Sequence, residues 1–137
     1  MNVFSESGLP DQENRGPGRA EPVEIWKARK FIAKYSDEEL SLTRVAKFVN
    51  ISANHLSEEF KDVTGINFVD YIARLRIEKA CDLLQDRHRK ISEIAFAVGF
   101  QSLSQFNRVF KRIKRKSPTQ FRAAPHNRGT KGYSMGG

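Results

Sequence analysis

The side chains best suited to directional hydrogen bonding in this 137-residue chain gather in one stretch, SLSQFNRVFKRIKRK, residues 102–116. Its first half offers hydroxyl, amide and guanidinium groups, which recognise a partner by its pattern of donors and acceptors. Its second half places five cations in the six residues 111–116. Cations at that density attract an anion whatever its hydrogen-bonding pattern. The stretch therefore combines selective recognition with a general attraction for negative charge.

Phe106 and Phe110 indicate how the chain holds these groups in place. They are four residues apart, the spacing that puts two side chains on one face of a helix. The other apolar residues of the same segment are Leu103, Val109 and Ile113. Ser102 precedes the pattern and is a good N-cap residue. The spacing predicts a helix over about 102–114, with its rings in the core and its polar groups exposed.

The net charge of +8 is concentrated around this predicted helix. Residues 87–122 hold ten basic residues and one acidic residue, a net of +9, whereas residues 21–86 hold ten basic and twelve acidic residues, a net of −2. One strongly positive segment is typical of a surface that meets a polyanion. The alternative, a charged face kept for solubility, usually mixes the two signs.

Double-stranded DNA fits this combination of groups. An α-helix enters its major groove, where Arg bonds bidentately to guanine and Asn or Gln to adenine. We predict base contacts from Ser104, Gln105, Asn107 and Arg108. We predict phosphate contacts from the helix start and the basic residues that follow it: Ser102, Lys111, Arg112, Lys114 and Lys116. The basic tract also fits a nuclear-localisation signal, but its position within a helix favours phosphate contacts.

A second copy of this pattern lies earlier in the chain. Val45 matches Ile94 at a separation of 49 residues, and Ser52 matches Ser102 at a separation of 50. The repeat predicts two helix–turn–helix units. In the first unit, the predicted base contacts are Asn54, Ser57 and Glu58, and the predicted phosphate contacts are Arg44, Ser52 and Lys61. Glu58 either accepts a hydrogen bond from a cytosine amino group or lies, beside Glu59, on a solvated face.

The predicted fold is all-α. No segment of adequate length alternates with period two, and apolar residues recur with the helical period instead. We expect about seven helices, in two helix–turn–helix subdomains joined by a long linker helix. The expected ranges are 1–20 for a disordered segment, 21–66 for the first unit, 67–86 for the linker helix, 87–123 for the second unit and 124–137 for a disordered tail.

The whole residue set resembles the AraC/XylS family of bacterial transcriptional regulators, over roughly residues 22–122. The second unit, ISEIAFAVGFQSLSQFNRVFKRIKRKSPTQFR, carries the strongest likeness, through Gly99-Phe100, Phe110-Lys111 and Ser117-Pro118. The first unit is similar through SLTRVAKFVNISANHLSEEFKDVTGINFVDYI, and the linker through RLRIEKACDLL, with Arg76 among its matches. Arg115 departs from the family, which often has Gly there. Glu58 and Glu59 also depart, because basic or amide side chains are common at their positions.

The resemblance implies a transcriptional activator. It implies two recognition helices, about 52–63 and 102–114, entering adjacent major grooves, and a helix from about Phe68 to Gln85 that fixes their separation. It implies double-stranded DNA and RNA polymerase as partners, and no cofactor. Many family members also have a sensing domain. The chain is therefore either a small regulator that binds DNA as a monomer or a piece of a longer protein with such a domain.

Other chemistries find little support in the sequence. Cys81 is the only cysteine, and it fits a packing residue better than a nucleophile, so no enzyme is expected. His55, His88 and His126 lack the spacing of metal ligands, so no metal site is expected. Trp26 and Phe48 are expected in the core rather than in a patch for a protein partner. The lone cysteine, the absence of a signal peptide and the lack of a long apolar run favour a cytoplasmic protein and no membrane association.

Overall fold

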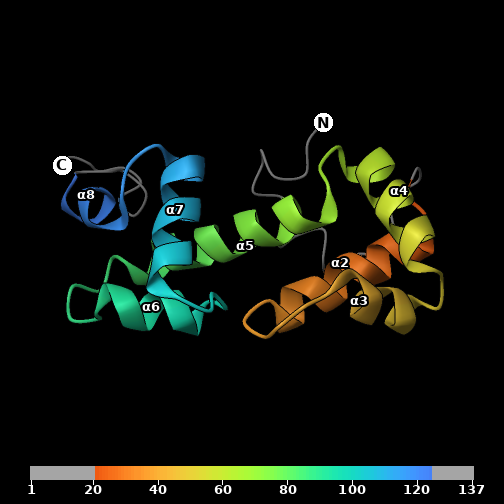
Figure 1. Cartoon of the computed structure of the whole chain (residues 1–137), viewed down its shortest axis with the longest axis horizontal. Helices are drawn as coiled ribbons and strands as arrows, with labels where there is room; N and C mark the ends of the chain where they lie inside the picture. The colour runs from red at the N-terminus through yellow and green to blue at the C-terminus, as the bar shows by residue number, and fades with distance from the viewer. Residues whose placement is uncertain (1–20, 125–137) are drawn as a thin grey trace. The chain divides into compact units, whose positions relative to one another are not determined.

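The computed structural model describes residues 21–124, and within that range every regular element is a helix (Figure 1). The all-α prediction is therefore confirmed. The helices are α2 (Val23–Tyr35), α3 (Leu42–Val49), α4 (Ala53–Thr64), α5 (Phe68–Leu83), α6 (Ile91–Ala97), α7 (Leu103–Lys114) and α8 (Pro118–Ala123). The segments expected to be disordered, residues 1–20 and most of 124–137, lie outside the described residues.

Side-chain caps start several of the helices, and Ser102 caps α7 as predicted. The hydroxyl oxygens of Ser41, Ser52 and Ser102 accept hydrogen bonds from the backbone N–H three residues later, at 3.0, 3.0 and 3.1 Å. Asn67 does the same for α5 through its Oδ1, at 2.8 Å from the nitrogen of Asp70. Each cap satisfies an amide that has no partner inside the helix. Ser117 caps α8 in the same way, at 3.1 Å from the nitrogen of Gln120.

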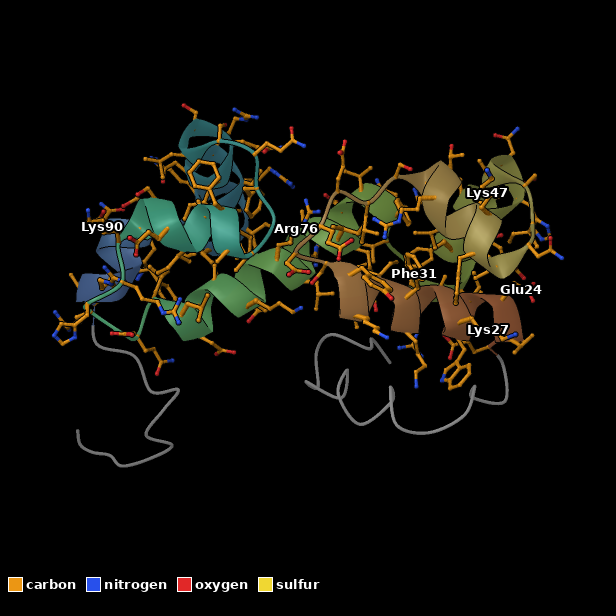
Figure 2. The ribbon with its side chains drawn as sticks, turned by 90° about the horizontal axis from the view of Figure 1, so that it is seen from below. Glu24, Lys27, Phe31, Lys47, Arg76 and Lys90 are labelled. Carbon is orange, nitrogen blue, oxygen red and sulfur yellow. The ribbon has the colours of Figure 1, made fainter. Side chains whose placement is uncertain are left out.

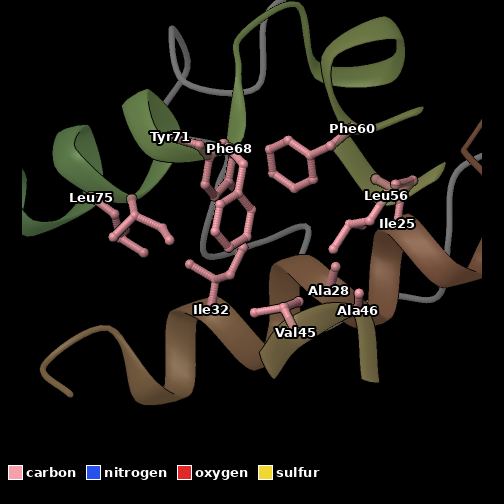
Figure 3. Close-up of a cluster of buried hydrophobic side chains, with 11 residues drawn as sticks. Ile25, Ala28, Ile32, Val45, Ala46, Leu56, Phe60, Phe68, Tyr71 and Leu75 are labelled. Atoms are coloured by element: carbon pink, nitrogen blue, oxygen red, sulfur yellow. The ribbon is translucent and has the colours of Figure 1, made fainter. Parts of the chain in front are cut away.

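The chain divides after Glu78 into two compact units, and α5 contributes residues to both. The division falls inside the segment 67–86 that was expected to form the linker helix. In the first unit, α2, α3, α4 and the first part of α5 surround one apolar core (Figure 3). Phe60 is fully buried, with its ring edge-on to Phe68 at 5.9 Å and to Tyr71 at 4.9 Å. Burying each such side chain stabilises the fold by roughly 1.5–3 kcal/mol.

The core of the second unit is built on a row of phenylalanines. Phe106 packs against Phe100 at 5.3 Å and against Phe110 at 5.5 Å, and Phe110 packs edge-on to Phe121 at 5.5 Å. Phe106 and Phe110 are fully buried. Cys81, on α5, is also buried, as expected of a packing residue. The rings fix α7 against its own unit through one face only.

An arginine holds the loop before each helix–turn–helix. In the first unit, Arg76 donates from Nε to the carbonyl oxygen of Ser36 and from Nη2 to that of Glu38, both at 2.8 Å. In the second, Arg122 donates from Nε to Leu84 at 3.0 Å and from Nη2 to Asp86 at 3.0 Å and Arg89 at 2.9 Å. These carbonyls lie beyond helix ends and would otherwise need water. Both arginines are therefore positioning residues for the helices that follow.

Candidate nucleic-acid interface

Helix α7 separates its apolar and polar side chains onto different faces. Phe106 and Phe110 have no exposed surface, whereas Ser104, Asn107 and Arg108 are exposed. The polar groups that could recognise base edges therefore lie on solvent-accessible positions of one rigid helix. Leu103 differs from the other apolar residues of this segment: it is 38% exposed, because it occupies the first helical position, away from the row of rings.

Gln105 has a structural role that the sequence did not indicate. Its side-chain oxygen accepts a hydrogen bond from the backbone nitrogen of Gln101 at 3.2 Å. Its own backbone nitrogen donates to the hydroxyl of Ser102 at 3.1 Å. Gln105 thus supports the turn into α7 as well as being a predicted base contact. The hydroxyl of Ser102 is exposed and, while it accepts this bond, still has its own O–H to donate.

The end of α7 carries the cations. Lys111 and Arg112 are exposed, and Lys114 and Lys116 are partly exposed. Basic residues in the last turn of a helix also interact favourably with its negative dipole end. Arg115 follows directly and ends the helix in the left-handed conformation, with φ 68° and ψ 12°. Arg115 therefore adopts the turn that a glycine would adopt without strain.

Helix α4 is the weaker copy of this arrangement. Asn54, Glu58 and Lys61 are exposed and Ser57 is partly buried. Glu59 turns away from them toward α2, where its carboxylate meets Glu24. The same carboxylate lies 3.4 Å from the Nε2 of His55, one turn earlier on α4. Only one of the two neighbouring carboxylates, that of Glu58, therefore belongs to the exposed polar face.

Glu24, His55 and Glu59 form a cluster across α2 and α4 that no spacing in the sequence indicated. One potential ligand atom from each lies within 4.8 Å of the others. Burial raises the pKa of Glu59, and the neighbouring carboxyl of Glu24 raises that pKa further. The Oε1 atom of Glu59 is buried and lies 3.4 Å from the Nε2 of His55. Protonation of Glu59 removes the repulsion between the two carboxylates, so the cluster is an acid-sensitive contact between the helices.

Arg44 has an internal role in place of a simple exposed charge. It donates to the carbonyl oxygen of Glu39 at 2.8 Å and to Oε1 of Glu38 at 3.2 Å. Its guanidinium also lies 5.4 Å from the ring centroid of Phe31 and 5.5 Å from that of Tyr35. These contacts hold Arg44 against its own unit. They leave its side chain 40% exposed, and its phosphate contact stays a prediction.

Phe48 is not in the core, contrary to the expectation from sequence. Its side chain is 56% exposed, and Trp26 is only partly buried. The core side of α2 is occupied by Ile25, Ala28 and Ile32, which leaves Trp26 on another face. Val23 is 50% exposed as well.

The remaining candidates from the sequence have no site around them. His88 is almost fully exposed, and His126 lies outside the described residues. Within residues 21–124, no helix combines the length and the apolar character that crossing a membrane requires. The exposed polar and basic face of α7 is thus the strongest candidate interface that the structure describes.

Two helix–turn–helix units with exposed second helices define a class of DNA-binding protein. A family model described as a helix-turn-helix domain matches residues 45–124, more than half of the chain. The chain belongs to the AraC-type family of helix-turn-helix transcriptional regulators. The family and the fold are those of transcriptional regulators and not of enzymes.

Several curated relatives match this chain over part of their length. An uncharacterised HTH-type transcriptional regulator of Staphylococcus aureus is 35% identical over 92 residues, 67% of this chain and 12% of that protein. The MmsAB operon regulatory protein of Pseudomonas aeruginosa is 29% identical over 92 residues, 67% of this chain and 30% of that protein. The HTH-type transcriptional activator Btr of Bacillus subtilis is 34% identical over 85 residues, 62% of this chain and 16% of that protein. The chain matches less than a third of each relative.

Solved structures show the same fold over most of their length. The C-terminal domain of AraT, a response regulator from Geobacillus stearothermophilus, has a TM-score of 0.72 and 33% identity, over 81% of this chain and 98% of that one. An AraC-type regulator from Chromobacterium violaceum has a TM-score of 0.68 and 27% identity, over 75% of this chain and 95% of that one. The DNA-binding domain of AdpA, solved in complex with a target DNA, has a TM-score of 0.69 over 73% of this chain and 90% of that one. At 21% identity, AdpA shows likeness of fold alone.

Proposed function

We propose that this chain is a sequence-specific reader of double-stranded DNA that inserts α4 and α7 into adjacent major grooves and regulates transcription. The observation that carries the proposal is the division of α7 into two faces. Phe106 and Phe110 are buried, so the helix is fixed on its own unit, while Asn107 and Arg108 are exposed. A rigid helix with exposed amide and guanidinium groups is what direct recognition of base edges requires.

The two units have unequal parts in this proposal. In α7, Ser104, Asn107 and Arg108 select bases, while Lys111, Arg112, Lys114 and Lys116 neutralise phosphates. The side-chain N–H groups of Gln105 can donate to a base while its oxygen holds the turn, and a bidentate contact with adenine would require that oxygen as well. In α4, Asn54 and Ser57 contact bases and Lys61 a phosphate. Glu58 is compatible only with a cytosine amino group or with solvent, so α4 contributes more to positioning than to selection.

The helix starts supply further phosphate contacts. Ser52 and Ser102 each accept a bond from a backbone amide of their own helix, which leaves the hydroxyl hydrogen to donate to a phosphate oxygen. The first turns of α4 and α7 also present backbone N–H groups and the positive end of the helix dipole. Successive half-sites on DNA lie about 34–36 Å apart, and α5 runs through both units as one helix, which supports simultaneous binding by one chain.

The regulatory outcome we propose is activation, through contact with RNA polymerase. The support is the relative from Bacillus subtilis, which is named a transcriptional activator and is 34% identical over the matched region. A chain that binds DNA as a monomer suffices for this role. A sensing domain in a longer protein would add control by an effector without changing the DNA contacts.

Selection from a pool of random double-stranded DNA tests the assignment of base contacts. We expect the native chain to enrich one defined site. Arg108→Ala should cost roughly 1–3 kcal/mol of binding free energy and relax the preference at one position of that site. Lys47→Ala, which removes an exposed charge from α3, is the matched control and should leave the site unchanged. An unchanged site in the Arg108 variant would show that α7 does not read bases as proposed.

A further inference from the structure

The first unit has a second surface that DNA recognition does not use. A hollow of about 400 Å³ lies between α2 and α3, on residues of the first unit alone. Its apolar wall is formed by Trp26, Phe31, Tyr35 and Phe48. Phe48 is 56% exposed, although an exposed aromatic ring at this position does nothing for the core. Contiguous exposed aromatic surface on a small domain is typical of a binding site for a partner.

Lysines form the rim of the same hollow. Lys27, Lys30 and Lys34 are exposed and line it, and their spacing of three and four residues places them along one stripe of α2. Phe31 and Lys27, on the same helix, can be followed in Figure 2. Among the described residues that line the hollow, none is acidic. The rim is therefore a cluster of positive charge around an apolar centre.

Cation–π contacts hold two of the ammonium groups at the rim. The Nζ of Lys30 lies 5.0 Å from the ring centroid of Trp26, and the Nζ of Lys34 lies 5.4 Å from that of Tyr35. Such contacts stabilise an exposed ammonium group by about 0.5–1 kcal/mol. Because the cations are already placed beside the aromatic wall, a partner's carboxylates can meet them with little further loss of side-chain entropy.

The aromatic wall favours a peptide over a nucleic acid. The ring of Phe31 is tilted against that of Phe48 at 4.5 Å and against that of Tyr35 at 4.7 Å. Rings packed against one another in this way form the side of a pocket, whereas single-stranded bases need open ring faces on which to stack. The phosphates of duplex DNA would use the lysines and leave the apolar wall unused.

We propose that this lysine-rimmed hollow binds an acidic peptide segment of a partner protein. An aromatic or long aliphatic side chain of the segment fills the hollow between Trp26 and Phe48. Carboxylates on either side of that anchor pair with Lys27, Lys30 and Lys34. Apolar burial at the centre supplies most of the affinity, and the charge pairs at the rim supply orientation and a faster association rate. The surface acts independently of the DNA contacts assigned to α4 and α7.

Peptide display on the full chain tests this proposal, with a random twelve-residue library as the probe. We expect enrichment of peptides with several Asp or Glu residues around one Phe, Trp, Leu or Ile. A synthetic copy of the most enriched peptide should bind the native chain, and replacing its acidic residues by Gln or its anchor by Ala should each weaken binding at least tenfold. A library that yields no acidic peptide with an apolar anchor would overturn the proposal.

Variants of the chain locate the peptide. Lys30→Glu and Phe48→Asp alter exposed side chains of the hollow, and each should weaken the peptide at least tenfold while leaving the thermal unfolding curve close to native. Lys47→Glu, an exposed lysine of α3 outside the hollow, is the matched charge control and should have little effect. Lys111→Glu on α7 is the second control, because any basic helix also attracts acidic peptides. A loss with Lys111→Glu equal to that with Lys30→Glu would show binding to α7 and contradict the proposal.

Two competing occupants have distinct results. If the hollow served DNA, Lys30→Glu would weaken duplex or single-stranded DNA binding and an oligonucleotide would displace the peptide. If it served a second copy of the chain, sedimentation would show a dimer that Phe48→Asp converts to a monomer. Either result would overturn the proposal. The expected result is that DNA affinity and molecular mass stay the same in both variants of the hollow.

Discussion

Arg115 ends α7 in the same left-handed backbone conformation that Gly65 adopts at the end of α4. Gly65 has φ 83° and ψ −4°, and Arg115 has φ 68° and ψ 12°. Each donates its backbone N–H to the carbonyl four residues earlier, Lys61 or Lys111, at 2.8 Å. The second unit therefore keeps the turn of the first although it lacks the glycine, and the side chain of Arg115 adds a cation next to the proposed phosphate contacts.

Replacing Arg115 by glycine should stabilise the second unit and weaken DNA binding. A residue with a side chain costs roughly 1–2 kcal/mol in the left-handed conformation, so Arg115→Gly should raise the unfolding midpoint by several degrees. Loss of the cation should weaken binding to all duplexes alike. Thermal unfolding followed by circular dichroism, with DNA titrations, measures both effects.

The matched control for that change is Gly65→Ala. A Cβ at Gly65 would meet no atom within 4 Å, so the only penalty is conformational, roughly 1–2 kcal/mol of destabilisation. Opposite shifts of the unfolding midpoint in the two variants are expected. A lower midpoint for Arg115→Gly would show that the side chain of Arg115 stabilises the fold by more than its backbone strain costs.

Glu59→Gln should change stability in a pH-dependent way. Burial, and then the carboxyl of Glu24, raise the pKa of Glu59 in the folded chain above its ordinary value of 4.5, while His55 opposes them and Asp62 adds to them. A raised folded pKa means that the folded state prefers the protonated form. That stabilisation is fully present below pH 4.5 and is lost as the pH rises through the folded pKa.

Glutamine imitates the protonated carboxyl at every pH. The variant should therefore unfold at a higher temperature than the native chain at pH 7, and the difference should shrink as the pH falls toward 4.5. Unfolding midpoints between pH 4 and pH 8 measure this trend. Glu58→Gln, on the exposed face of α4, is the control and should shift the midpoint little. A difference that stays constant with pH would contradict the role assigned to burial beside Glu24.

The sequence was a good guide to the helices because their signals are local. Serine caps and apolar residues three and four apart are each read within a dozen residues, and Ser102, Phe106 and Phe110 behave as predicted. The repeat also identified α4 and α7 as equivalent. The predicted helices 52–63 and 102–114 therefore match α4 and α7 to within one residue at their ends.

Contacts between helices could not be predicted from these local signals. Arg44 bonds to Glu38 and Glu39 and covers two rings, which depends on how α2 meets α3. Glu59 turns toward Glu24, 35 residues earlier in the chain. The exposure of Phe48 follows from which face of α3 the core occupies, the face of Val45 and Ala46. Each outcome depends on tertiary packing, which the periodicity of one helix does not determine.

Phe106→Ala should strongly destabilise the second unit. The ring is fully buried and contacts Phe100 and Phe110 at 5.3 and 5.5 Å. Removing a buried phenylalanine leaves a cavity and typically costs about 3–5 kcal/mol. Chemical denaturation monitored by circular dichroism measures the loss. A native-like denaturation curve would show that Phe106 is not the residue that fixes α7 to its unit.

Lys111→Ala should reduce the salt dependence of DNA binding. Each phosphate contact contributes about 0.9 to the slope of log K against log salt concentration, so the variant should lose about one unit of slope and weaken specific and non-specific binding alike. Titrations at several salt concentrations measure the slope. The control is Lys47→Ala on α3, which should keep the native slope. An unchanged slope for Lys111→Ala would remove Lys111 from the phosphate contacts.

Hydroxyl-radical footprinting of the intact chain on its selected site tests the central claim most directly. Two recognition helices on one chain should protect two stretches of the DNA backbone about one helical turn, 10–10.5 base pairs, apart. Both stretches should appear together as the protein concentration rises. Protection limited to a single groove, or an equal footprint on DNA of any sequence, would contradict the account.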